Sequence, residues 1–348
     1  MSRSLRHFLL AIGGLAIGLA LGLVVAGLAG EKPLDILLII GKSAFGSRYD
    51  LGVTLYYCTP LIFTGLSVAV AFHAGLFNIG AEGQLNVGTL AATVAALAVP
   101  GLPPVIAPLF AVFCGMMAGG LWAWIAGWLR TVRGSHEVIT TIMMNFIASA
   151  LTSWAVTARL QNPESQNPET HSVAAAYFFR TVDPLAQWFG DAPVSLAFPV
   201  AVLVAAIVWV FLYRTSYGFE LRACGQNERA AAASGINVAR TRQMAMFLAG
   251  ALAAGVALSE VFGAAGKYKL GFSPEFGFIG IAVALLARSN PMGVLFTAFL
   301  FAALHKGAAD LDIETENVTR DLSLVIQALV ILAVAILSSV RIGRTKKP

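Results

Sequence analysis

Residues 51–72 read LGVTLYYCTPLIFTGLSVAVAF, a run of 22 residues without a charged side chain. A helix needs about 20 consecutive apolar residues to cross the hydrocarbon core of a bilayer. This run is therefore long enough to span a membrane once. Similar runs recur along the whole chain, and their number decides the fold class.

The composition points the same way. Hydrophobic residues make up 58% of the 348 residues, charged residues make up 12%, and the mean hydropathy is +0.78. A soluble domain is about half apolar and about a quarter charged, so a soluble core could not absorb this much apolar surface. We expect an all-α, polytopic membrane protein with a single transmembrane domain over residues 1–348.

Charged residues and Pro or Gly breaks divide the apolar runs into about ten predicted spans. They are residues 8–28, 51–72, 82–99, 105–129, 138–157, 196–213, 244–262, 276–287, 292–304 and 322–338. The eighth and ninth spans are short, and the sequence leaves their ends open.

The charges between the spans predict the orientation. With a cytoplasmic N-terminus, 14 of the 23 Lys and Arg residues fall inside and 14 of the 18 acidic residues fall outside. Cytoplasmic loops carry the excess of positive charge, so both termini are predicted to be cytoplasmic. The basic residues form no basic helix face, and nucleic-acid binding is not expected.

Ten spans divide into two sets of five that run in opposite directions, as in transporters with inverted repeats. The third and eighth spans then correspond, and in both of them Gly and polar residues interrupt the apolar pattern. The interruptions read NIGAEGQ at residues 78–84 and GFSPEFGF at residues 271–278. Paired broken helices of this kind point to a translocation path.

Glu82 lies in the first of these interruptions. A carboxyl group beside long apolar runs is costly unless it is paired, protonated or facing water. One interpretation is that Glu82 lines the path or holds a broken helix together. The other is that it caps a helix end, where acidic residues are favourable, without contacting cargo.

The longest predicted cytoplasmic loop covers residues 214–242. Within it, Asn227 precedes an Ala-rich stretch that Gly235 closes, which predicts a short capped helix. Such a helix would suit docking to a soluble partner, and an ordinary connector is the alternative.

The longest predicted extracytoplasmic loop covers residues 159–193. It carries four aromatic residues that we expect to anchor at the membrane surface, namely Tyr177, Phe178, Phe179 and Trp188. A receptor-facing or interfacial element is the alternative.

No motif predicts catalysis or the binding of a metal or cofactor. The stretch GKS at residues 41–43 lacks the glycine that a P-loop needs five positions earlier, where Ile36 stands. The three cysteines are isolated and have no ligand-spaced partners. We expect a non-catalytic chain without ATP bound by that motif.

Three stretches resemble the permease subunits of ATP-binding-cassette importers in the branched-chain amino acid, ribose and nucleoside group. They are FNIGAEGQ at 77–84, HEVITT at 136–141 through Asn145, and residues 218–236. The first is similar to nucleoside-type permeases in particular. The resemblance covers about residues 51–337, and the chain looks like the longer of the two permeases in such systems.

This resemblance implies the permease subunit of an importer that moves a small polar solute across the bacterial inner membrane into the cytoplasm. A nucleoside is the expected solute. The resemblance also implies a separate ATPase subunit, a second and different permease subunit, and an extracytoplasmic substrate-binding protein. A helix over residues 226–234 would seat in the ATPase. An importer of sugar or amino acid with the same architecture, or a proton-coupled secondary transporter, are the alternatives.

Two sets of candidate residues follow. The candidates for lining the path are the polar Asn78, Glu82, Gln84 and Asn145, and, as stacking surfaces for a base, Phe77, Phe276 and Phe278. The candidates for ATPase coupling are Arg222, Gln226, Asn227, Glu228, Arg229 and Gly235.

Overall fold

The computed structural model describes residues 3–28, 30–179 and 184–315, and the single positions 325, 328, 329, 332, 333 and 336. Over these residues the protein is helical, and its only β-structure is two isolated bridges, so the predicted all-α fold is confirmed. The tenth predicted span, 322–338, lies outside the described residues except at those single positions.

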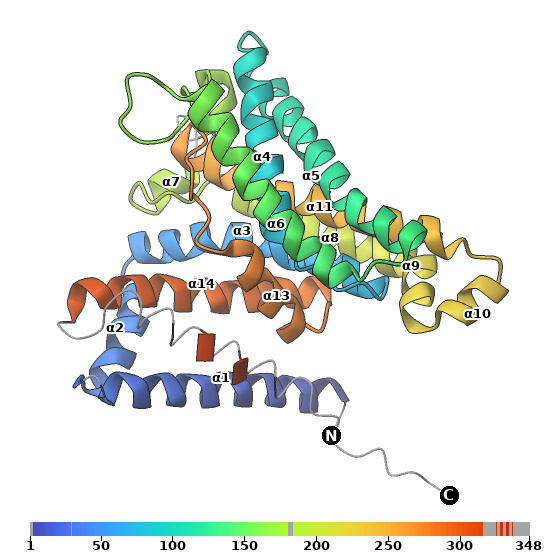
Figure 1. Cartoon of the computed structure of the whole chain (residues 1–348). Coiled ribbons are helices and arrows are strands. Elements are labelled where there is room, and N and C mark those ends of the chain that lie inside the picture. The colour runs from blue at the N-terminus through green and yellow to red at the C-terminus, as the bar shows by residue number, and fades with distance from the viewer. Residues whose placement is uncertain are drawn as a thin grey trace, which may run out of the picture.

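The helices follow one another along the chain in the order shown in Figure 1. They are α1 Arg3–Leu28, α2 Pro33–Phe45, α3 Arg48–His73, α4 Ala81–Ala98, α5 Ile106–Arg133, α6 Glu137–Ala155, η1 Val156–Leu160, η2 Ala175–Tyr177, α7 Pro184–Trp188, α8 Ala197–Arg214, α9 Ser216–Gln226, α10 Glu228–Ala233, α11 Val238–Ala254, α12 Ala257–Ser259, η4 Glu260–Ala265, α13 Phe276–Leu286 and α14 Pro291–Glu314. The elements η1 and η4 are π-helical, and η2 is a 3₁₀ turn.

Among the described residues, six helical segments are long and apolar enough to cross a membrane. They are Arg48–His73, Ile106–Arg133, Glu137–Leu160, Ala197–Arg214, Val238–Ala265 and Pro291–Leu311. The chain is therefore a multi-pass membrane protein. The predicted count of ten spans stays a prediction, since α1, α4 and α13 match predicted spans but are not among these six.

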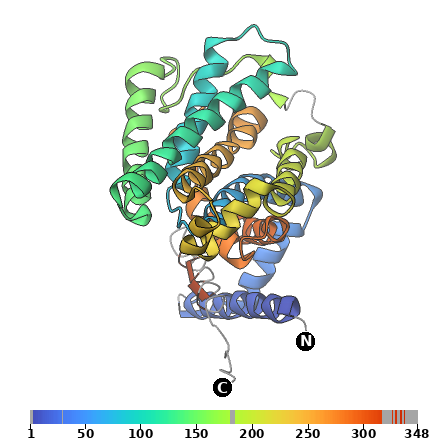
Figure 2. The ribbon, with the colours of Figure 1, turned by 90° about the vertical axis from the view of Figure 1, so that its right-hand side faces the viewer.

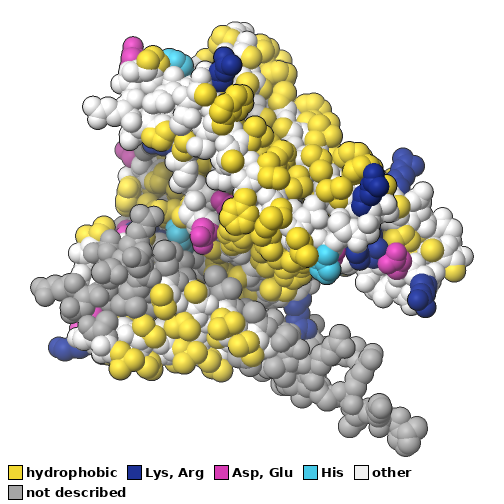
Figure 3. Space-filling model, viewed as in Figure 1, with side chains coloured by type: hydrophobic (Ala, Val, Ile, Leu, Met, Phe, Trp, Pro, Cys, Tyr) yellow, Lys and Arg dark blue, Asp and Glu magenta, His cyan; other side chains and the backbone are white. Residues whose placement is uncertain are grey.

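The core of the molecule lies around α3 and the α11–η4 run, whose membrane-length windows are 78% and 89% buried. Helix α3 packs against α13, α14 and α11, and Figure 2 shows these helices enclosed by the others. In contrast, α5, α6 and α8 expose large apolar side chains such as Leu109, Phe146 and Leu203. Hydrophobic side chains also cover the middle of the face in Figure 3, which suits contact with lipid or another membrane subunit.

One helix lies outside the predicted spans, and the ninth span, whose end the sequence left open, is longer than the predicted range. Helix α2 was not predicted, because a run of 13 residues is too short to cross a bilayer. Helix α14 continues to Glu314, beyond the predicted end at residue 304. The charge of Lys306 suggested a loop, but this side chain is 9% exposed and pairs with Asp310 one turn later on the same helix. The pairing lets a Lys stay inside the helix.

The loop at residues 159–193, predicted to be extracytoplasmic and called the outer loop from here on, is tied to the residues that follow η4. The backbone N–H of Thr170 donates to Tyr268 O at 3.0 Å, and Lys267 Nζ lies 2.6 Å from Glu169 Oε1. Tyr177 is fully buried and donates its hydroxyl to Val99 O at 2.5 Å, so the prediction that it anchors at the membrane surface is wrong. Burial of the ring under this docked loop is the reason, whereas Trp188 is 60% exposed.

Candidate functional site

The helical backbone is interrupted between α3 and α4, over residues 74–80. Helix α3 ends at His73, Gly75 takes a left-handed φ of +72°, and α4 begins at Ala81. Inside the break, Asn78 and Gln84 form two reciprocal amide hydrogen bonds, each of 2.9 Å. Both side chains are buried, so their polar groups are satisfied by each other.

Helix α6 closes the same break from the side. Asn145 Oδ1 accepts from Gly83 N at 2.8 Å, and Asn145 Nδ2 donates to Ile79 O at 2.9 Å. Thr141 Oγ1 accepts from Ile79 N at 3.3 Å. A broken membrane helix is tolerated where neighbouring side chains satisfy the freed backbone groups, and Asn145 and Thr141 do so here.

The second break precedes α13. Glu275 takes a left-handed φ of 64°, and α13 begins at Phe276, whose N–H donates to Ser273 Oγ at 3.1 Å. The next N–H, on Gly277, donates to Glu82 Oε2 at 2.7 Å. Two helix N-termini that are far apart in the sequence therefore meet at one carboxyl group.

The backbones come very close at this junction. A Cβ atom on Gly277 would lie 2.3 Å from Glu82 N, so only glycine fits there without a shift. The other oxygen of Glu82 lies 3.4 Å from Asn86 Nδ2, and Asn86 Oδ1 accepts from Tyr268 Oη at 3.3 Å. The Glu82 carboxyl group thus joins α4, α13 and the loop that precedes α13.

Sequence reasoning missed the roles of Gly277, Ser273 and Tyr268. Gly277 lies inside the interruption at residues 271–278, but nothing in that stretch of sequence indicates which residue it contacts. Its contact is with a residue 195 positions away in the chain, which no local pattern can reveal.

The three aromatic candidates lie in different environments. Phe276 is 1% exposed, and its ring centroid is 6.4 Å from those of Tyr57 and His305. Phe77 and Phe278 are 37% and 40% exposed, and Phe77 lies 5.0 Å from Phe72. The exposed rings of Phe77 and Phe278 are therefore the two that remain accessible to a ligand.

The loop at residues 214–242, which the charge pattern predicts to be cytoplasmic, folds into two helices, α9 and α10. Asn227 Oδ1 accepts from Ala230 N at 3.1 Å, which caps α10, and Gly235 takes the left-handed φ of +84° after it. The predicted capped helix is confirmed. The implied range 226–234 is wrong, since Gln226 ends α9 and the extended backbone of Asn227 separates the two helices.

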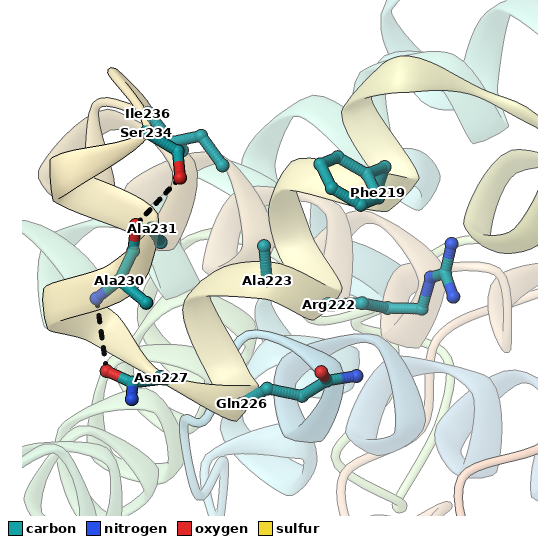
Figure 4. A pocket seen from close by; sticks show the side chains of 9 residues that line it. All are labelled: Phe219, Arg222, Ala223, Gln226, Asn227, Ala230, Ala231, Ser234 and Ile236. Carbon is teal, nitrogen blue, oxygen red and sulfur yellow. Dashed lines mark hydrogen bonds between the residues drawn. The ribbon is translucent and has the colours of Figure 1, made fainter.

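A hollow of about 240 Å³ lies between α9 and α10. Figure 4 shows the side chains that line it, including Phe219, Arg222 and Gln226 from α9 and Ile236 beyond α10. Phe219 on α9 is 61% exposed. The hollow is lined by apolar side chains such as Ala223 and Ile236 and by polar ones such as Gln226 and Asn227.

Helix α10 is also fixed to α11. Arg242 Nη1 lies 3.0 Å from Glu228 Oε2, whereas Arg229 is exposed. Burial raises the pKa of the nearby Cys224 thiol. Figure 3 shows several Lys and Arg side chains gathered at the end of the molecule that α9 and α10 form. No group of three or more His, Cys, Asp or Glu residues is placed to hold a metal within the part of the chain that the structure describes.

Two interrupted helices that meet inside an apolar, multi-pass chain are a feature of many membrane transport proteins. Residues 51–335 match the family described as branched-chain amino acid transport system / permease component, and the chain belongs to this family. It is a permease of the ATP-binding-cassette type.

Three relatives resemble the chain along most of its length. The guanosine ABC transporter permease protein NupP of Bacillus subtilis is 35% identical, and the match covers 100% of this chain and 99% of NupP. The nucleoside ABC transporter permease protein NupB of Lactococcus lactis is 31% identical, with 97% and 93% covered. The glucose ABC transporter permease protein TsgB13 of Haloferax volcanii is 33% identical, with 93% and 83% covered.

Proposed function

We propose that this chain is the permease subunit of an ATP-driven importer that carries a nucleoside into the cytoplasm. The observation that carries the proposal is the full-length similarity to a permease named for guanosine. The whole chain, 1–348, would form one permease domain.

The junction of the two broken helices favours an uncharged cargo. Exposed N–H groups at a helix N-terminus are a binding site for anions. Here the first N–H groups of α13 are already used by Ser273 and Glu82, and at the start of α4 the N–H groups of Gly80 and Gly83 are used by Asn78 and Asn145. A carboxylate or phosphate on the cargo would compete with these groups. A nucleoside or a sugar fits this site better than an amino acid or a nucleotide.

The accessible aromatic rings favour a nucleoside over a sugar. Phe77 and Phe278 offer faces on which a base could stack, and base stacking on an aromatic side chain contributes about 1–3 kcal/mol. A sugar importer of the same architecture is the second candidate, because TsgB13 is named for glucose.

The partners follow from the same proposal. The chain carries no P-loop, so a separate ATPase would supply the energy and would dock on α9 and α10. Arg222, Gln226, Asn227, Glu228, Arg229 and Gly235 are the coupling candidates. A second, different permease subunit would cover the exposed apolar helices, and an extracytoplasmic binding protein would deliver cargo at the opposite end.

The proposed location is the bacterial inner membrane, with both termini in the cytoplasm. Helix α1 begins at the same end of the molecule as α9 and α10 in Figure 1, which supports a cytoplasmic N-terminus. A reporter fused after residue 348 tests the other terminus.

Uptake into proteoliposomes tests the proposal. The complex that copurifies with the chain would be supplied with ATP and with labelled guanosine, guanosine monophosphate, glucose and leucine in turn. We expect ATP-dependent uptake of guanosine alone. Uptake by the isolated chain under a pH gradient without ATP would show a secondary transporter instead, and preferential glucose uptake would favour the sugar importer.

A further inference from the structure

The end of α3 touches α9 through backbone atoms. A Cβ atom on Gly225 of α9 would lie 2.2 Å from His73 O and 2.9 Å from Gly75 N. A Cβ atom on Gly75 would lie 3.1 Å from Gly225 Cα. No side chain separates the two backbone segments here. A displacement of α9 therefore cannot be absorbed by rotation of a side chain.

A second contact reinforces the first. The guanidinium carbon of Arg222, one turn before Gly225, lies 5.2 Å from the ring centroid of Tyr213 at the end of α8. The Tyr213 ring in turn stands edge-on to the His73 ring at 5.9 Å. Arg222 therefore holds α9 against the same end of α3.

His73 also reaches the turn between α13 and α14. Its Nε2 lies 3.0 Å from Ser289 O, and because a carbonyl oxygen only accepts, this nitrogen carries the proton. Arg288 and Ser289 in that turn both take left-handed φ values, 52° and 58°, although neither is glycine. Such backbone positions store strain and persist only when neighbours hold them.

One position thus borders both broken helices. The backbone that leaves His73 passes through the break at 74–80 into α4, and the His73 side chain holds the turn at the far end of α13. The N-terminus of α4, where the break ends, meets the N-terminus of α13, the end opposite the Ser289 turn, at Glu82 and Gly277. Helices α4 and α13 are therefore linked at the junction and again, through His73, near α9.

We propose that His73, Gly75 and Gly225 form a joint that transmits displacement of α9 and α10 to α4 and α13 together. This inference rests on the proposed docking of an ATPase at α9 and α10. His73 is a positioning residue in this joint, and it acts through Ser289 and through its own carbonyl group.

The test uses the complete complex in a membrane and measures ATPase copurification, ATP hydrolysis and cargo uptake for each variant. Gly225→Ala forces α9 away from α3, and His73→Leu removes the contact to Ser289. Gly41→Ala is the matched control, because a Cβ atom on this α2 glycine meets nothing within 4 Å.

Gly225→Ala overpacks a tight contact and His73→Leu removes a hydrogen bond. We expect both variants to retain copurification and hydrolysis within about twofold while uptake falls about tenfold. His73→Gln should recover most of the uptake, because its amide N–H can donate to Ser289 O. Gly41→Ala should behave like the unmodified chain.

The inference is overturned if Gly225→Ala and His73→Leu transport normally, or if hydrolysis and uptake fall by the same factor. It is also overturned if His73→Gln is no better than His73→Leu. If the unmodified complex shows no ATP-driven uptake, the proposed function itself is wrong, and the two failures are thereby distinguished.

Discussion

Glu82 Oε2 accepts a hydrogen bond of 2.7 Å from the backbone N–H of Gly277, and this bond joins the first turn of α4 to the first turn of α13. A carboxyl group at a helix N-terminus is favourable because the exposed N–H groups there carry partial positive charge. Glu82 therefore caps a helix that is not its own, and by accepting from a freed backbone N–H it also holds the second broken helix in place, so each interpretation of the sequence contains part of this role.

The first prediction concerns Gly277. Gly277→Ala places a methyl group against the backbone of Glu82 and should destabilise the protein by about 1–3 kcal/mol. We expect a lower melting temperature in detergent and loss of uptake. Gly101→Ala is the control, since a Cβ atom there has no neighbour within 4 Å. Equal melting temperatures for the two variants would contradict the close approach.

The second prediction concerns the amide pair of Asn78 and Gln84. Asn78→Ala removes both partners of the Gln84 amide and Gln84→Ala removes the acceptor of Asn78 Nδ2, so either change leaves a buried amide group unpaired, at a cost of about 1–3 kcal/mol. The double replacement should cost less than the sum, because the two amides satisfy each other. Thermal unfolding of both single variants and the double variant measures this coupling. Asn78→Ala combined with Gln187→Ala, at an exposed position of α7, should be additive, and additivity in both pairs would refute the prediction.

The third prediction concerns the cap of α10. Asn227→Ala should cost about 1 kcal/mol and speed amide hydrogen exchange in residues 230–234 roughly fivefold. Asn227→Asp should keep exchange slow, because a carboxylate accepts from Ala230 N equally well. Exchange measured by mass spectrometry checks both variants, and exchange in α3 should not change. Identical exchange in Ala and Asp variants would argue against the cap.

The fourth prediction concerns pH and the outer loop. The hydrogen bond from Lys267 lowers the pKa of Glu169 below its usual 4.5, and Ser165 adds to this effect. A carboxyl group with a lowered pKa in the folded state stabilises the protein fully above the unfolded value, and this contribution is lost as the pH falls through the folded value.

Glu169→Gln should therefore lower the melting temperature at pH 6, and the difference from the unmodified chain should shrink as the pH falls below about 4.5. Glu164→Gln, at an exposed position of the same loop, serves as the control and should change little. A difference for Glu169→Gln that is constant from pH 3 to pH 7 would count against the ion pair.

Much of the fold follows from hydropathy. Each of the nine predicted spans that the structure describes coincides with a helix or with the α11–η4 run, because apolar length is a local property. The predictions fail at residues whose environment is set by contacts that the local sequence pattern does not contain. Lys306 suggested the end of a span, but Asp310 and Asp50 neutralise it inside α14. Tyr177 suggested a surface anchor, but the outer loop folds back and buries it.

For the candidate site residues too, the sequence identified the residues but not their partners. Sequence reasoning found Asn78, Glu82, Gln84 and Asn145 because polar residues are rare beside apolar runs. It did not show that Asn78 and Gln84 bond to each other or that Asn145 bonds to the backbone of the break. Their role in lining a path stays a prediction, since most of their hydrogen-bonding groups are used within the protein.

By itself, the sequence determined that this chain is a helical membrane protein with two interrupted helices and a capped helix after Asn227. Length, apolar content and capping chemistry are properties of neighbouring residues, so the sequence contains them directly. Only the tertiary structure decided that Glu82 meets Gly277 and that His73 lies between α9 and the α13–α14 turn. These contacts join residues far apart in the chain, and packing of whole helices sets them.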